Sequence, residues 1–176
     1  ALALRRRQAK VALLDPGPFP PVTPAETETG FMMFTSGSTG RPKGVLLSHN
    51  SHRWTAEMRM IQTPMKGERV LIAAPLYHMN ALALSLLVCA GGGECVLLPQ
   101  FEATAFIDAI GTFGVTWLTA VPPMIAMMLQ EKEALANGDL SSVGTVRMGS
   151  APVNDALATQ ISDLWPNARV INAYGT

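Results

Sequence analysis

Charged side chains are scarce in this sequence, and neither sign prevails. Its 176 residues include 13 basic and 13 acidic side chains, so the formal net charge is zero. A nucleic-acid-binding domain normally carries a basic face, so this balance argues against that class of protein. The apolar fraction of 48% is sufficient for one domain with a substantial core, or for one large piece of a bigger domain.

Cysteine and long apolar runs are also scarce. Cys89 and Cys95 lack the Cys-x-x-Cys spacing and the neighbouring histidine of a metal site. We expect two buried thiols in a reducing compartment. The longest apolar run, 81–90, has about half of the ~20 residues that a bilayer span needs. Because no signal peptide is visible either, the sequence predicts a cytoplasmic protein without a transmembrane segment.

Short apolar runs alternate with longer amphipathic segments along the chain. A helix-like stretch at 1–14 and a Pro-rich linker at 15–24 come first. The rhythm that follows is typical of βαβ units, so we predict an α/β fold with a largely parallel sheet and flanking helices. The expected strands are 30–34, 44–47, 69–73, 94–98, 115–118, 145–148 and 169–171. The expected helices are 49–62 (with Ser48 as N-cap), 81–90, 103–113, 123–136 and 155–164.

A glycine-rich loop, FTSGSTGRPKG at 34–44, lies between the first two expected strands. It contains three glycines, four hydroxyl groups and one lysine. A Walker A motif would place Gly-Lys-Ser/Thr at a helix start, whereas here Pro42 precedes Lys43 and a strand follows. Glycine lets backbone N–H groups approach an anion closely, so the loop suits a polyphosphate. A flexible surface hairpin is the alternative.

The stretch FTSGSTGRPKGVLLSH resembles the phosphate-loop motif of the adenylate-forming superfamily. That superfamily contains acyl-CoA synthetases, the adenylation domains of peptide synthetases, and luciferases. PLYHMNAL at 75–82, GSAPV at 149–153 and NAYGT at 172–176 also match, in the family's order. The resemblance implies a partial AMP-binding domain at 29–176, truncated at its C-terminal end, after an upstream helix and linker at 1–28. Such a domain would be a fragment of the large N-terminal domain of an adenylate-forming enzyme.

The resemblance also implies a reaction. A carboxylate would attack the α-phosphorus of ATP to give an acyl-adenylate and pyrophosphate, and the acyl group would then pass to CoA. Because two anions must meet, the protein's main tasks would be positioning and charge neutralisation. Mg²⁺ would bridge phosphate oxygens, and no metal ligand is expected within the chain.

Roles for individual residues follow from the same resemblance. Catalytic roles are expected for Lys43, His78 and Thr176, with Thr176 reaching the α-phosphate. The residues expected to hold the outer phosphates are Thr35, Ser36, Gly37, Ser38, Thr39, Gly40 and Lys43. Those expected around adenine and AMP are Gly149, Ser150, Ala151, Pro152, Asn172, Ala173, Tyr174, Gly175 and Thr176, with Tyr174 stacked on the base. The expected acyl pocket comprises His78, Met79, Asn80 and Ala81.

His78 carries the information about substrate class. A lone histidine in apolar surroundings is more often structural than catalytic. By resemblance, however, it occupies the position beside the substrate carboxylate. Peptide-synthetase adenylation domains typically carry an aspartate in this region for the amino group, and residues 70–93 contain no acid. We therefore favour a fatty or aryl acid. The alternatives are an amino-acid-activating domain and a non-catalytic nucleotide-binding module.

His49 and His52 form an H-x-x-H pair without an obvious third metal ligand, so we expect capping and surface roles for them. The chain departs from the family pattern after Thr176, where the family continues with a glutamate that helps to hold Mg²⁺. We therefore expect a fragment of an acyl-CoA synthetase of the long-chain fatty-acid CoA ligase type, inactive by itself. A mean hydropathy of +0.23 predicts exposed apolar surface, with self-association or a homodimer as the result.

Overall fold

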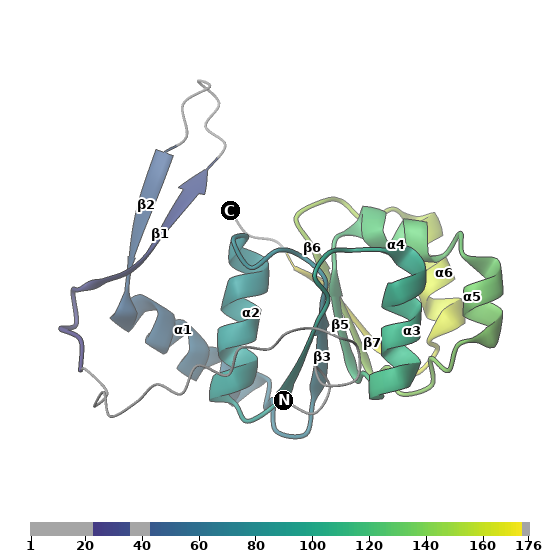
Figure 1. The fold of residues 1–176 in the computed structure, drawn as a ribbon, viewed down its shortest axis with the longest axis horizontal. Helices are drawn as coiled ribbons and strands as arrows, with labels where there is room; N and C mark the ends of the chain where they lie inside the picture. Colours follow the sequence, from purple (N-terminus) through teal and green to yellow (C-terminus); the bar gives the residue numbers. More distant parts are fainter. Residues whose placement is uncertain (1–22, 36–42, 174–176) are drawn as a thin grey trace. The chain divides into compact units, whose positions relative to one another are not determined.

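The computed structural model describes residues 23–35 and 43–173. The chain divides into two compact units, one up to Met58 and one from Arg59 onward. The helices and strands of the two units carry the labels of Figure 1.

The first unit contains a β-hairpin followed by most of a helix. Strands β1 (Thr29–Thr35) and β2 (Lys43–Ser48) pair antiparallel, and Thr35 lies opposite Lys43 in the register. Helix α1 (His49–Gln62) follows directly. The Ser48 hydroxyl accepts a hydrogen bond of 3.1 Å from the Ser51 N–H, which confirms Ser48 as the residue that caps this helix.

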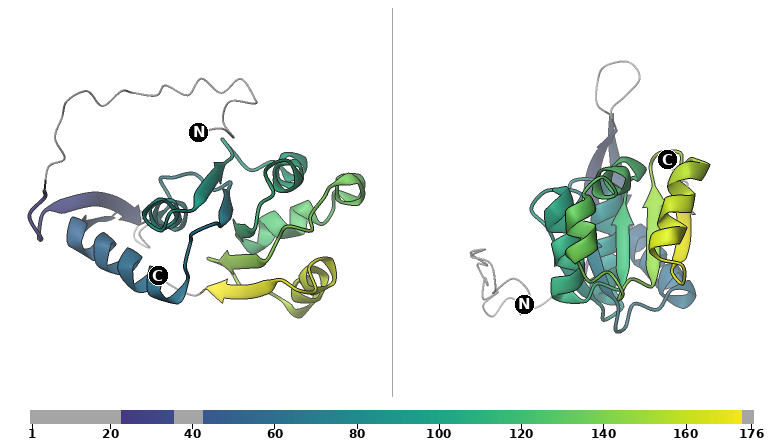
Figure 2. Two further views of the ribbon diagram at one scale, coloured as in Figure 1. Left: turned by 90° about the horizontal axis from the view of Figure 1, so that it is seen from below. Right: turned by 90° about the vertical axis from the view of Figure 1, so that its right-hand side faces the viewer.

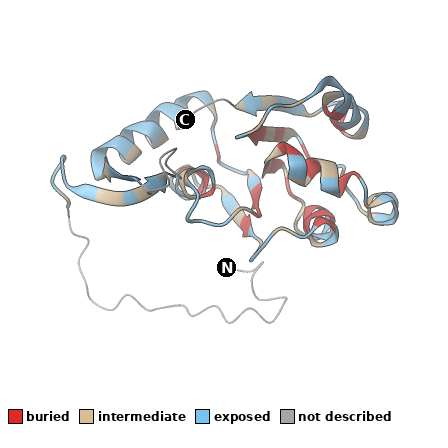
Figure 3. Cartoon of the chain, turned by 90° about the horizontal axis from the view of Figure 1, so that it is seen from above, coloured by how far each residue is buried: buried red, intermediate tan, exposed pale blue. Residues whose placement is uncertain are grey.

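The hairpin has little core of its own. Met32, Phe34 and Leu46 share one face of the pair, and their exposed fractions are 55%, 68% and 60%. Helix α1 has no buried residue. Figure 3 accordingly shows the hairpin and this helix in the colours of exposed and intermediate residues. The expectation of exposed apolar surface is therefore confirmed for the described part of this unit.

The second unit is built on a five-stranded parallel sheet in the order β4-β3-β5-β6-β7. The predicted α/β fold with a parallel sheet is thus confirmed. The strands are β3 (Arg69–Ile72), β4 (Glu94–Leu97), β5 (Trp117–Ala120), β6 (Thr145–Gly149) and β7 (Arg169–Ala173). The helices between them are α2 (Met79–Ala90), α3 (Ala103–Phe113), α4 (Pro122–Met128), α5 (Lys132–Asn137) and α6 (Asp155–Leu164).

The strand order places α2 on one side of the sheet and α3 to α6 on the other (Figure 2). From β3 the chain moves in one direction to β4, by way of α2, and then in the opposite direction to β5, β6 and β7, by way of α3 to α6. Because crossovers between parallel strands are right-handed, helices that connect strands in opposite directions lie on opposite faces of the sheet. Leu118 and Met148 belong to one core cluster with side chains of α3, α4 and α6, such as Phe106. The buried side chains of α2 lie outside that cluster. Ligand crevices of such sheets lie at the carboxyl ends of the strands, where the order reverses.

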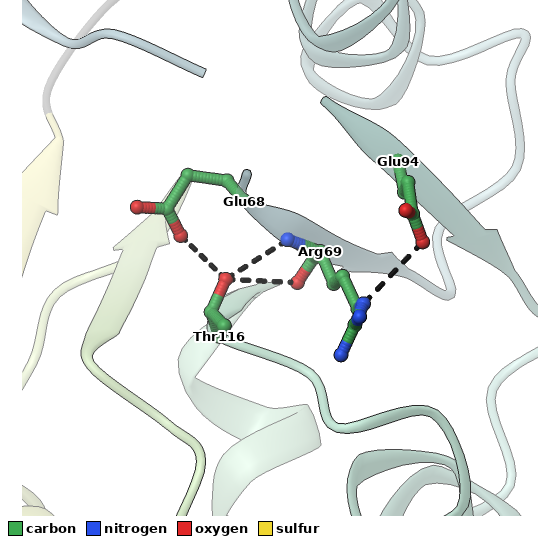
Figure 4. A network of polar contacts seen from close by, with 4 residues as sticks. All are labelled: Glu68, Arg69, Glu94 and Thr116. Atoms are coloured by element: carbon green, nitrogen blue, oxygen red, sulfur yellow. Dashed lines mark hydrogen bonds and ion pairs between the residues drawn. The ribbon is translucent and has the colours of Figure 1, made fainter. Parts of the chain in front are cut away.

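The amino edge of the sheet is closed by a polar network (Figure 4). The Thr116 hydroxyl accepts a hydrogen bond of 2.9 Å from the Arg69 N–H and donates one to the Glu68 carboxylate. The Arg69 Nε lies 3.4 Å from Glu94 Oε2. These contacts tie together the starts of β3, β4 and β5. The charges of this network therefore lie at the edge opposite the expected site.

Most of the expected strands and the helix 81–90 differ from the structure by one or two residues at an end, and the two largest differences concern the helix 123–136 and the strand 115–118. The expected helix 123–136 is two helices, α4 and α5, because Glu131 has a ψ of 68°, far from helical values. Strand β5 begins two residues later than predicted. Val115 donates its N–H to the Ile110 carbonyl at the end of α3 (3.0 Å), so it still belongs to the helix end, and Thr116 makes the first backbone bond to β3, from its N–H to the Arg69 carbonyl (3.0 Å).

The prediction of two buried thiols is wrong. Cys89 is exposed and Cys95 is only partly buried. Val88 occupies the buried position in the last turn of α2, and the next residue points about 100° further round the helix. Among the described helices, none combines the length and apolar character that crossing a bilayer requires.

Candidate functional site

The ends of the glycine-rich loop are the last residue of β1 and the first of β2. Because Thr35 and Lys43 are paired, the two ends of the loop are held side by side. The Lys43 residue is exposed. The remaining predicted phosphate-binding residues, Ser36, Gly37, Ser38, Thr39 and Gly40, lie outside the described residues.

His78 immediately precedes α2, in the loop that leaves the carboxyl end of β3. Its backbone is extended (φ −88°, ψ 134°), and its carbonyl accepts hydrogen bonds from Ala81 and Leu82. The imidazole makes no capping bond, is exposed, and lies against the Tyr77 ring with centroids 4.6 Å apart. The side chain is therefore available to a ligand rather than used by the helix.

The other predicted acyl-pocket residues occupy the first turn of α2. Met79 is half-buried and Ala81 is buried, with an exposed fraction of 1%. Asn80 is exposed. The first turn thus offers one imidazole and one carboxamide at the protein surface.

The segment Gly149–Pro152 leaves the carboxyl end of β6. Gly149 is buried, and a Cβ atom there would lie 3.0 Å from the Ala173 carbonyl oxygen. Ser150 has a φ of 66°, which places a non-glycine residue in the left-handed region. The chain then enters α6, whose N-cap Asn154 accepts a hydrogen bond of 2.8 Å from the Leu157 N–H.

The adjacent strand β7 ends at Ala173, directly beside Gly149 in the register, and Asn172 pairs with Met148. Two of the stretches expected around the nucleotide, 149–152 and 172–173, therefore lie side by side, although they are far apart in the sequence. Tyr174, Gly175 and Thr176 lie outside the described residues.

A hydrogen bond of 2.7 Å from Asn80 Nδ2 to Ser150 Oγ joins two of the matched motifs. It brings the His78 segment to the Gly149–Pro152 segment at the carboxyl edge of the sheet. The motifs predict Asn80 in the acyl pocket and Ser150 in the nucleotide site, but they do not indicate that the two residues are in contact. Nothing in a single sequence indicates that two residues 70 positions apart form a pair.

Arg147, which is partly buried on β6, is a second feature that sequence reasoning missed. Burial, together with the positive charge of Arg59, holds the pKa of its guanidinium below the usual value. The signal in the sequence is a single charged residue inside an otherwise apolar strand run.

Within residues 23–35 and 43–173, no three His, Cys, Asp or Glu side chains gather as a metal site would require. His49 is exposed, and His52 packs edge-on against Phe31 at a ring-centroid distance of 4.7 Å. The H-x-x-H pair thus occupies surface and packing positions on the first unit.

Comparison with known proteins assigns the chain to a family. The family model described as AMP-binding enzyme matches residues 3–176. The chain is 37% identical over 134 residues to a feruloyl-CoA synthase of an Amycolatopsis species, which covers 75% of the chain. It is 33% identical over 172 residues to 4-coumarate–CoA ligase 2 of Oryza sativa, which covers 94% of the chain.

Solved structures show the same fold. The inhibitor-bound N-terminal domain of FACL13 from Mycobacterium tuberculosis superposes with a TM-score of 0.80 at 29% identity, over 89% of this chain and 39% of that one. The o-succinylbenzoate–CoA synthetase MenE of Bacillus subtilis, in complex with ATP and magnesium, superposes with a TM-score of 0.75 at 27% identity, over 86% of this chain and 31% of that one.

The chain spans 27% of the feruloyl-CoA synthase and 30% of the rice ligase, so it corresponds to a limited part of each relative. The curated relatives named above are acyl-CoA synthases and ligases. Because the family model covers nearly the whole chain, the chain belongs to the family of AMP-binding enzymes.

Proposed function

We propose that the chain is part of an ATP-dependent acid–thiol ligase. The ligase would join a carboxylic acid to the α-phosphate of ATP, release pyrophosphate and then pass the acyl group to CoA. One observation carries the proposal: the segments that follow β3 and β6 lie at one carboxyl edge of the sheet, beside the last residues of β7. The Asn80–Ser150 hydrogen bond and the Gly149–Ala173 pairing hold these segments in place.

The proposed substrate is an aryl or fatty acid with a plain carboxylate. His78 supports this choice, because its exposed imidazole can donate a hydrogen bond to a carboxylate oxygen. The curated relatives named above are a feruloyl-CoA synthase and a 4-coumarate–CoA ligase, which favours an aryl acid over a long-chain fatty acid. Met79, Asn80 and Ala81, in the first turn of α2, border the proposed acyl site.

The proposed triphosphate site is the glycine-rich loop from Thr35 to Lys43. Its hydroxyl groups and backbone N–H groups would bind the outer phosphates, and the Lys43 cation would stabilise the departing pyrophosphate. When bound, Mg²⁺ would neutralise phosphate charge. Stacking of Tyr174 on adenine and contact of Thr176 with the α-phosphate belong to the same proposal.

The chain is proposed to act only within a longer, cytoplasmic enzyme. Its relatives are about three times as long or longer, since the chain spans 27% and 30% of them. The exposed apolar face of the hairpin, formed by Met32, Phe34 and Leu46, would be covered in that longer protein. In the isolated chain the same face would favour self-association.

The test is carboxylate-dependent exchange of labelled pyrophosphate into ATP, measured on the full-length protein with aryl, fatty and amino acids. Exchange with an aryl or fatty acid, followed by acyl-CoA formation when CoA is added, is the expected result. Lys43→Ala and His78→Ala should abolish most of the exchange. Lys132→Ala, an exposed lysine in α5, is the matched control and should leave it unchanged.

The other outcomes identify the alternatives. Exchange driven only by amino acids would indicate an amino-acid-activating domain. Nucleotide binding without exchange for any acid would indicate a non-catalytic nucleotide-binding module. Exchange that survives His78→Ala with an unchanged KM for the acid would remove His78 from the acid site.

A further inference from the structure

We infer that Asn80 is a positioning residue, which sets the distance between the acid-binding and nucleotide-binding segments through its hydrogen bond to Ser150. The inference rests on the proposed function. It assigns to Asn80 a contact with the protein rather than with the acid itself.

The hydrogen bond joins segments that follow two non-adjacent strands of the sheet. The His78 segment follows β3 and Ser150 follows β6, and β5 lies between these two strands. Strands two positions apart in a sheet are separated by about 10 Å. Among the described residues, the 2.7 Å bond from Asn80 Nδ2 to Ser150 Oγ is the one side-chain hydrogen bond that joins these two segments. It therefore bridges the carboxyl end of β5.

The Ser150 backbone supplies an independent observation. A φ of 66° is a conformation that glycine adopts freely, whereas a serine there costs on the order of 1 kcal/mol. A glycine would relieve the strain but would lose the hydroxyl. The Ser150 hydroxyl oxygen accepts a hydrogen bond from the Asn80 side-chain amide, so the strained backbone carries the hydroxyl group that forms the bridge.

The start of α2 has no local side-chain cap. Asparagine near a helix start usually bonds to the local backbone, and here the Asn80 amide bonds across the sheet edge instead. The N-cap His78 makes no side-chain capping bond. Packing anchors α2 through Ala81 in the first turn and through Leu84, Leu87 and Val88 further along, and the bridge adds a polar contact on the exposed side of the first turn.

The chemistry explains why such a bridge matters. In the proposed reaction a carboxylate oxygen must reach the α-phosphorus, and near-attack distances are about 3–3.5 Å. If each segment binds its own ligand, loosening the bridge leaves both ligands bound but misaligned. Loss of the bridge should therefore lower kcat and leave each KM nearly unchanged.

The experiment compares Asn80→Ala, Ser150→Ala and the double variant in the full-length enzyme. In each we expect kcat of acid-dependent pyrophosphate exchange to fall about ten- to a hundred-fold, with the KM for acid and for ATP within about threefold of wild type. The double variant should be no slower than the slower single variant, because both substitutions remove the same bond. Asn137→Ala, an exposed asparagine at the end of α5, is the matched control and should be unchanged.

Ser150→Gly separates positioning from stability. Glycine relieves the positive φ, so this variant should melt no lower than Ser150→Ala, yet it should be equally slow. A kcat that follows the melting temperature across the variants would overturn the inference in favour of a merely structural bond.

A raised KM for the acid in Asn80→Ala, with Ser150→Ala silent, would overturn it in favour of direct contact between Asn80 and the acid. Additive losses of kcat in the double variant would also contradict it. No exchange in the wild-type enzyme with any acid would overturn the proposed function, and the inference with it. An active wild type with unchanged kcat in Asn80→Ala would overturn the inference alone.

Discussion

A Cβ atom on Gly149 would lie 3.0 Å from the carbonyl oxygen of Ala173, on the neighbouring strand. Gly149 ends β6 and pairs with Ala173 at the end of β7, so the two nucleotide-associated segments approach each other through a bare backbone. The obstructing atom belongs to the backbone, which yields less easily than the end of a flexible side chain.

Gly149→Ala should therefore destabilise the fold. We expect a loss of about 1–3 kcal/mol, because the added methyl group forces the ends of β6 and β7 apart. Chemical denaturation would measure it. Gly144→Ala is the matched control, since its Cβ would lie 3.8 Å from the nearest atom, the Thr116 carbonyl oxygen, at ordinary contact distance. Equal stability of the two variants would contradict the close approach at Gly149.

The amino-edge network predicts a loss of stability at Thr116. Thr116→Val removes the acceptor of the Arg69 N–H and the donor to the Glu68 carboxylate while keeping the side-chain shape. We expect a loss of about 1 kcal/mol in the free energy of unfolding, a typical value for hydrogen bonds at a partly exposed site. Thr116→Ser keeps the hydroxyl and should lose much less. A valine variant no less stable than the serine variant would show that the hydroxyl does not stabilise this edge.

Glu102 makes the stability depend on pH. It caps α3: its carboxylate accepts 2.7 Å hydrogen bonds from the Thr104 hydroxyl and the Ala105 N–H, and one of 3.0 Å from the Thr104 N–H. The Thr104 hydroxyl is the largest cause of a lowered pKa for Glu102, followed by the two backbone N–H groups. The folded protein thus holds the Glu102 proton less tightly than the unfolded chain does.

The sign of the effect follows. The stabilisation from Glu102 is fully present above the ordinary glutamate pKa of about 4.3, and it is lost as the pH falls through the lower folded pKa. Glu102→Gln should reduce the slope of unfolding free energy against pH in this acid range. In Thr104→Ala the Glu102 pKa, followed by NMR, should rise toward its ordinary value, while the two backbone N–H groups continue to lower it. An unchanged pKa there would show that the hydroxyl is not the main cause.

The two cysteines should differ in reactivity. Burial raises the pKa of the Cys95 thiol to about 11, with a smaller contribution from Cys89, whereas Cys89 is exposed. Near pH 8, about one Cys95 thiol in a thousand is then ionised, and the thiolate is the reactive form. Alkylation by iodoacetamide, mapped by mass spectrometry, should modify Cys89 first. Modification of both at equal rates in the folded protein would contradict the difference in burial.

Local patterns predicted most of the fold. The bounds of α3 and α6 agree with the sequence residue for residue, since apolar periodicity and capping residues such as Asn154 act within one or two turns. The break between α4 and α5 was missed. Glu131 leaves the helical region without a proline or glycine to signal it, so the turn there depends on how Met128 and Leu129 pack into the core.

The sequence by itself determined the motifs, and with them the family, because a phosphate loop and the stretches around His78, Ser150 and Asn172 can be recognised from consecutive residues. Only the tertiary structure decided which of these stretches meet. The Asn80–Ser150 bond, the positive φ of Ser150 and the close approach of Gly149 to Ala173 all depend on the order and register of the sheet. Strand order is set by packing between residues far apart in the chain, and a local pattern carries no information about it.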